Sequence, residues 1–93
     1  MKDMQNLLEK IKNDLSSKNK EDRIYAIRAC CIQKICNDSI VELLNGLKQD
    51  DSIAMYTKIS DGAIAALDIL GIEQYKGKDQ CVMDLIKSVF YSI

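Results

Sequence analysis

Apolar residues recur every three or four positions along most of the chain, which is the spacing that places them on one face of an α-helix. Leu7, Leu8, Ile11 and Leu15 form the first of these stripes. Short polar segments separate the stripes, and the pattern predicts five helices, over about residues 3–15, 20–36, 39–49, 52–70 and 80–91. The β-branched residues fall at helical spacing instead of alternating with polar ones, so we expect no strands.

Residues suited to helix ends flank the predicted segments. Asn19 and Asp79 can each accept a hydrogen bond from the first turn of the helix that follows. Ser39 and Glu42 match a capping box, in which two side chains satisfy the first free amides of a helix. Gly71 suits the C-terminal end of the fourth helix, because glycine adopts a left-handed backbone at little cost.

The fourth predicted helix is apolar on most of its sides. Ala63 and Leu67 belong to one apolar face, and Ala65 and Ile69 lie on the other side. A helix with this pattern is covered by neighbours in most directions, and its small residues let them approach closely. We therefore expect it at the centre of the molecule.

An internal repeat organises these helices. Residues 6–14 resemble residues 42–50 at an offset of 36, and residues 84–90 repeat the apolar positions after a further 42. Residues 23–32 align with residues 58–67 at an offset of 35. A leucine-paired helix and a small-residue helix thus alternate. Periods near 40 residues with two helices per unit are typical of α-solenoids.

The second unit, residues 39–53 followed by 62–71, resembles the HEAT-repeat family. In that family a first helix ends in a leucine and an acidic turn, and a second helix carries a small-residue run, then Ala-Leu and often Leu-Gly. The resemblance extends over most of residues 3–90. This chain lacks the family's common proline, has Lys58 where Arg23 stands in the first unit, and has a longer second helix in the second unit.

The resemblance implies an all-α fold: a short right-handed α-solenoid of about five helices, with two HEAT-like helical hairpins and a C-terminal helix. It also implies a scaffold that grips proteins or, in some members, nucleic acid, and it carries no catalytic residues. Armadillo-like packing and a plain helical bundle remain alternatives.

Composition narrows the class of protein. Ninety-three residues with 47% apolar side chains make one domain, residues 1–93. The net charge of −1 argues against a dedicated polyanion binder, and the absence of His removes the commonest acid–base and metal-binding side chain. No apolar run approaches the ~20 residues that span a bilayer, and the first residues are too polar for a signal peptide. We therefore expect a cytoplasmic protein with no cofactor.

The four cysteines are expected to be reduced core residues. Cys30 and Cys31 are adjacent, Cys36 follows, and Cys81 is distant. Adjacent helical side chains diverge by about 100°, which disfavours a disulfide between the first two. A zinc site would need all four thiolates or carboxylate substitutes, so a metal or redox role is the alternative.

Several surface residues are candidates for binding a partner. Tyr25 and Arg28 share one side of the second helix, where packing on a neighbouring helix is the alternative. Lys58, Asp61 and Asp68 trace a polar line with Ala65 on the fourth helix, where a Lys58–Asp61 ion pair is the simpler account.

The chain end and the charge distribution suggest self-association. Residues 1–36 carry a net charge of +3 and residues 37–93 a net charge of −4, so copies could orient head to tail. The C-terminal segment with Val89, Phe90 and Ile93 is apolar where the last helix of a solenoid is usually polar. Either this helix folds back as a cap, or these three residues form an association surface that supports a homodimer.

These observations predict a small non-catalytic protein–protein interaction module, an adaptor or inhibitor that acts by occupying a partner's surface. Two alternatives remain. One is nucleic-acid binding through the basic stretch between Lys10 and Arg28, which the interleaved acidic residues make unlikely. The other is a thiol- or metal-based redox protein built on the four cysteines.

Overall fold

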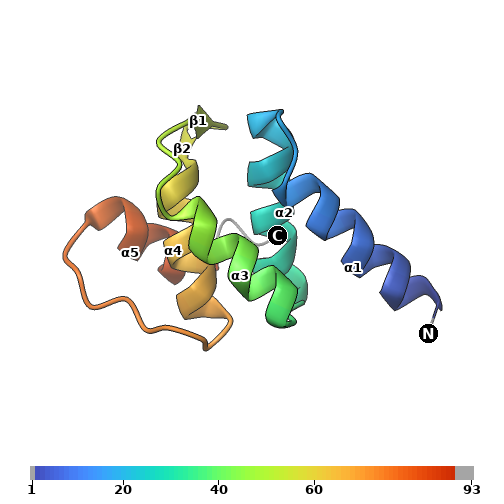
Figure 1. Ribbon diagram of the computed structural model, residues 1–93. Coiled ribbons are helices and arrows are strands. Elements are labelled where there is room, and N and C mark those ends of the chain that lie inside the picture. The colour runs from blue at the N-terminus through green and yellow to red at the C-terminus, as the bar shows by residue number, and fades with distance from the viewer. Residues whose placement is uncertain (1, 90–93) are drawn as a thin grey trace.

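The computed structural model describes residues 2–89, which form five α-helices and one two-stranded β-hairpin (Figure 1). The helices are α1 (Lys2–Leu15), α2 (Lys20–Gln33), α3 (Asp38–Leu47), α4 (Ile59–Ile69) and α5 (Gln80–Lys87). The hairpin strands β1 (Ile53–Ala54) and β2 (Thr57–Lys58) lie between α3 and α4. A mostly helical fold is confirmed.

The helix ends are set by specific local hydrogen bonds. Asn19 caps α2 and Asp79 caps α5, each accepting a 2.9 Å hydrogen bond from an amide in the first turn, as predicted. The predicted capping box at Ser39 is wrong. Asn37 caps α3 instead, because its extended backbone lets its side-chain oxygen accept from the Ile40 amide at 2.9 Å.

The prediction that the fourth helix begins near residue 52 is wrong, and so is the prediction of no strands. Ile53 pairs with Lys58 and Ala54 with Thr57 in an antiparallel hairpin. The amide of Ile59 donates to the Ser52 carbonyl at 2.8 Å, and the amide of Ser60 donates to the Asp50 carbonyl at 2.8 Å. These bonds satisfy two of the first free amides of α4 from outside the helix, so α4 begins only after the hairpin.

Helix α4 is the centre of the molecule, as its sequence predicted. It packs against α2, α3 and α5, and Ile59, Ala63 and Ala66 are fully buried. The small side chains of Ala63 and Ala66 let the neighbouring backbones approach closely, so three helices can pack on this one short helix. Complete burial of Ile59 stabilises the fold by roughly 1.5–3 kcal/mol.

The other four helices surround this centre. Helix α1 packs on α2 and on α3, and α3 and α5 both pack on α4 (Figure 1). Within the described part of the chain, α5 does not pack along α3. The C-terminal end of α3 instead faces the segment between α4 and α5, where Lys48 pairs with Glu73.

One partly buried ion pair ties the helix pairs together. The Nε atom of Arg23 on α2 lies 2.9 Å from Oδ2 of Asp50, which follows α3, although the N–H is not aligned as a hydrogen bond. The Nη1 atom of Arg23 donates to the Ser17 carbonyl at 2.7 Å, so the same side chain also holds the α1–α2 turn.

No helix within residues 2–89 combines the length and apolar character needed to cross a bilayer.

Candidate functional site

Among the side chains that the structure describes, the most exposed apolar ones lie on the hairpin, next to a strained backbone. Its two-residue turn, Met55 and Tyr56, has φ values of 54° and 62°, as in a type I′ turn, where Asn and Gly are preferred. Tyr56 is 101% exposed and Ile53 57% exposed. Left-handed backbone is costly for bulky side chains. The fold therefore holds large apolar groups in water at a position where smaller residues would be more stable.

A cleft of about 330 Å³ lies beside the hairpin. It is lined from three elements: the hairpin, the first turn of α4 and one side of α5. The lining residues are Ile53, Tyr56, Thr57, Lys58, Asp61, Cys81, Asp84 and Leu85. Because Thr57 and Leu85 are buried, the floor is fixed by the core, and the exposed hairpin side chains form the wall.

The cleft is acidic at its α4–α5 side. Ligand atoms of Asp61, Asp79 and Cys81 lie within 4.8 Å of one another. Burial raises the pKa of Asp61 above its ordinary value, and the negative charge of Asp79 raises it further, while Lys58 partly opposes both. Asp79 also accepts the hydrogen bond that caps α5. The site thus concentrates negative charge in a partly desolvated place.

These three groups are also the donor set that a metal ion would meet. Two carboxylates and a thiolate can bind a divalent cation. Asp79 and Cys81 are exposed, and exposed acidic groups commonly cluster without a metal. The cluster by itself therefore does not define a metal centre.

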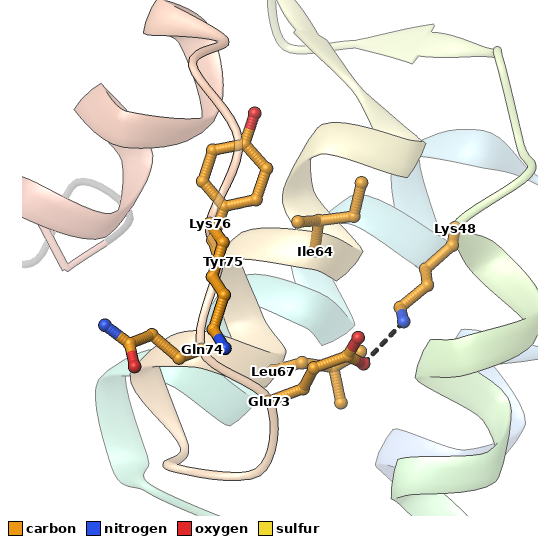
Figure 2. Close-up of a pocket in the computed structure, with 7 residues that line it drawn as sticks. All are labelled: Lys48, Ile64, Leu67, Glu73, Gln74, Tyr75 and Lys76. Atoms are coloured by element: carbon orange, nitrogen blue, oxygen red, sulfur yellow. Dashed lines mark hydrogen bonds and ion pairs between the residues drawn. The ribbon is translucent and has the colours of Figure 1, made fainter.

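A second cavity, of about 590 Å³, opens between the C-terminal end of α3 and the segment that joins α4 to α5 (Figure 2). Ile64 and Leu67 of α4 contribute apolar lining, and the Tyr75 ring stands on the segment across from Ile64 (Figure 2). Nζ of Lys48 lies 2.6 Å from Oε1 of Glu73 and bridges the two sides. The cavity therefore combines apolar side chains of α4 with polar and charged side chains from the end of α3 and the α4–α5 segment.

The wall of this second cavity is held by Tyr75. Its amide donates to Oδ2 of Asp68 at 2.8 Å, and its hydroxyl oxygen accepts from the Asp79 amide at 2.9 Å. A Cβ atom added at Gly77 would overlap the Tyr75 ring, so a larger residue there would displace that ring. The same segment therefore ends the larger cavity and places Asp79 in the acidic cleft.

The structure separates the residues predicted to bind a partner. Lys58 and Asp61 line the cleft beside the hairpin. Asp68 is half-buried and anchors the amide of Tyr75 instead. Lys58 lies on β2, not on a helix, and it does not form the predicted ion pair with Asp61, because the two residues are not one helical turn apart on one helix. Ala65, predicted on the same polar line, is fully buried.

The two candidates on α2 lie elsewhere. Tyr25 is 53% exposed, and Arg28 is half-buried on the same helix. Neither lines the cleft or the larger cavity. Their role in binding stays a prediction.

The predicted self-association segment is only partly described. Val89 is half-buried after the end of α5, and its amide donates to the Ile86 carbonyl at 3.0 Å. Phe90 and Ile93 lie outside the described residues. The homodimer remains a prediction.

The cysteines divide into two kinds. All four are free thiols; Cys30 and Cys31 are fully buried in α2, as predicted. Burial raises the pKa of each of these two thiols to about 12, so neither supplies a thiolate near neutral pH. Cys81 is exposed and Cys36 half-buried, so the prediction of a core role is wrong for Cys81, which lines the cleft from α5.

Sequence reasoning missed the hairpin and most of the cleft. Ile53, Tyr56 and Thr57 are residue types typical of strands, but the turn between them has no Gly, Asn or Asp to signal it. Cys81 and Asp84 carried no pattern that would pair them with Asp61, which lies on another helix. No signal in the sequence could have located the cleft.

Comparison of the chain with protein-family models, with curated proteins and with solved structures gives no match.

Proposed function

We propose that this protein is a small non-catalytic protein–protein interaction module of the cytoplasm, which acts by occupying a partner's surface. The single observation that carries the proposal is the hairpin turn, where Met55 and Tyr56 expose apolar side chains from a left-handed backbone. Aromatic residues displayed in this way are typical anchors of protein interfaces. Free thiols at all four cysteines support a reducing compartment.

We further propose that the first four helices are two HEAT-like hairpins stacked as in a short solenoid. Three contacts support this arrangement: α1 with α3, α2 with α4, and α3 with α4. The Arg23–Asp50 pair joins the second helix of one unit to the turn of the next. In this arrangement the β-hairpin replaces the start of the second unit's second helix, so the hairpin projects from the turn between its two helices.

The strain of the turn favours a binding role over a structural one. A type I′ turn with Asn-Gly would avoid the strain that Met55 and Tyr56 impose, which is of order 1–3 kcal/mol per strained residue. The Tyr56 side chain gains nothing from packing, because it is fully exposed. An exposed aromatic side chain on a strained backbone is explained by contact with another molecule.

Site-specific photo-crosslinking tests this function. Tyr56 is replaced by p-benzoylphenylalanine, and Ile72 is replaced in the same way as the matched control. Ile72 is 48% exposed and follows the opposite end of α4, which an 11-residue helix places roughly 16 Å away. After irradiation of cells that contain the protein, we expect one dominant adduct from position 56 and none of that mass from position 72.

The captured protein must then bind the purified wild-type chain and not the Met55→Asn/Tyr56→Gly variant. That variant keeps the hairpin and removes both apolar groups, so its thermal unfolding temperature should be equal or higher. Equal adduct yields from the two positions, or unchanged binding of the captured protein to the double variant, would refute the proposed function.

A further inference from the structure

We propose that the hairpin and the acidic cleft beside it form one docking surface for a partner segment that carries a Lys or Arg next to a bulky apolar residue. In this arrangement the apolar residue packs on Ile53 and Tyr56, and the cation lies against Asp61. The inference rests on the proposed function and names the chemistry of the partner.

The charge of the cleft selects a cation. The carboxylates of Asp61 and Asp84 line the cleft against one lining ammonium, that of Lys58. The carboxylate of Asp79 lies within 4.8 Å of the ligand atoms of Asp61 and Cys81. None of the carboxylates of Asp61, Asp79 and Asp84 forms an ion pair within residues 2–89. The ion pairs in that range use the carboxylates of Glu9, Asp14, Asp50 and Glu73. The cleft therefore has a negative excess that its own residues leave uncompensated.

Asp61 is the carboxylate best placed to use a partner's cation. It lies half-buried in the first turn of α4. The other two carboxylates already accept hydrogen bonds: Asp79 from the backbone amide of Cys81 at 2.9 Å, and Asp84 from the side-chain amide of Gln80 at 2.7 Å. Burial and the charge of Asp79 raise the pKa of Asp61. An arriving guanidinium or ammonium would offset the charge of Asp79 and pair with the partly desolvated Asp61 carboxylate.

The shape of the surface sets the apolar half of the motif. Ile53 and Tyr56 form the hairpin wall of the cleft, and the buried Leu85 contributes its floor. A cleft of about 330 Å³ accommodates one or two side chains and not a folded domain. Lys58 is exposed at the rim, where its long side chain can turn toward water when a second cation enters.

Peptide display identifies the motif directly. A phage library of random twelve-residue peptides is selected on the full-length protein and counter-selected on the Met55→Asn/Tyr56→Gly variant. We expect the enriched peptides to share a Lys or Arg beside Leu, Ile, Phe, Tyr or Trp. The most enriched peptide is then synthesised with a fluorophore, and its dissociation constant is measured by anisotropy at low and at high salt.

Matched charge variants locate the cation. Asp61→Asn should weaken binding of this peptide about tenfold at low salt, with a smaller loss at high salt because ions screen the pair. Asp51→Asn is the control, since Asp51 is an exposed carboxylate near the hairpin that does not line the cleft, and it should leave the dissociation constant within about twofold of the wild-type value.

The outcomes separate the two proposals. Enriched peptides without a basic residue, or an equal effect of Asp61→Asn and Asp51→Asn, overturn the inference while hairpin-dependent binding keeps the proposed function. If no peptide depends on Met55 and Tyr56, this inference fails together with the use of the hairpin as a binding surface.

Discussion

Replacing Arg23 with Met should destabilise the protein more than any exposed charge substitution, because this one guanidinium contacts both the turn after α1 and the turn after α3. The side chain of Arg23 is 14% exposed and that of Asp50 is 19% exposed. Methionine preserves the apolar stem of Arg23 and removes only its polar head. The variant therefore isolates the polar contacts.

The magnitude follows from those contacts. A hydrogen bond from a charged donor, such as the 2.7 Å bond to the Ser17 carbonyl, contributes about 1.5–3 kcal/mol. Exposed surface ion pairs contribute about 0.2–1 kcal/mol, and disrupting a fully buried pair costs about 3–5 kcal/mol. The partly buried Arg23–Asp50 pair should lie between these two values. We expect Arg23→Met to cost about 3 kcal/mol and the coupling energy between Arg23 and Asp50 to be about 1–2 kcal/mol.

The pH dependence of this coupling has a definite sign. Burial raises the pKa of Asp50, but hydrogen bonds from Ser52 and the charge of Arg23 outweigh it, so the pKa falls below the ordinary value of 3.8. A folded-state pKa that is lowered gives stability that is present above pH 3.8 and is lost as the pH falls through the lower folded value. The coupling should therefore be full at pH 7 and shrink in stronger acid.

The assay is a double-mutant cycle by urea unfolding, followed by circular dichroism at 222 nm with a reducing agent present. It uses the wild type, Arg23→Met, Asp50→Asn and the double variant at pH 7 and in acid. The exposed Lys10–Asp14 pair, with Lys10 73% exposed, is the matched control and should show no resolvable coupling. A coupling energy of zero between Arg23 and Asp50 at pH 7 would refute the reasoning.

Three further outcomes are expected. Cys81 should react with Ellman's reagent in the first fast phase, because it is exposed. The two thiols buried in α2, whose pKa values burial raises to about 12, should react only on unfolding. Reaction of more than two thiols in the folded protein would contradict this. Gly77→Ala should lower the free energy of unfolding by about 1–3 kcal/mol, because the added methyl group overlaps the Tyr75 ring. Gly46→Ala in α3, where the Cβ position is open space, should raise the free energy of unfolding by about 0.5–1 kcal/mol. Equal effects of the two substitutions would exclude the overlap. Burial and a neighbouring carboxylate raise the pKa of Asp61, so its stabilising contribution is complete below pH 3.8 and is lost as the pH rises through the folded value. At pH 7 the Asp61→Asn variant should therefore have a higher thermal unfolding temperature than the wild type. A lower unfolding temperature would contradict the effect of burial on Asp61.

The sequence by itself determined the helices and the position of α4. Periodicity located all five helices, and the caps at Asn19 and Asp79 were readable because a capping side chain bonds to an amide only two residues away. The small apolar residues on most sides of α4 indicated a central helix, because burial follows directly from which sides of a helix lack polar groups.

Only the tertiary structure decided where α4 begins and what lies beside it. The amides of Ile59 and Ser60 donate to the carbonyls of Ser52 and Asp50. With these hydrogen bonds the chain forms a hairpin where periodicity predicts a continuous helix. The cleft likewise joins Asp61 to Cys81, twenty positions further along. Contacts between distant residues depend on how helices pack and how loops return, and local spacing does not record either of these.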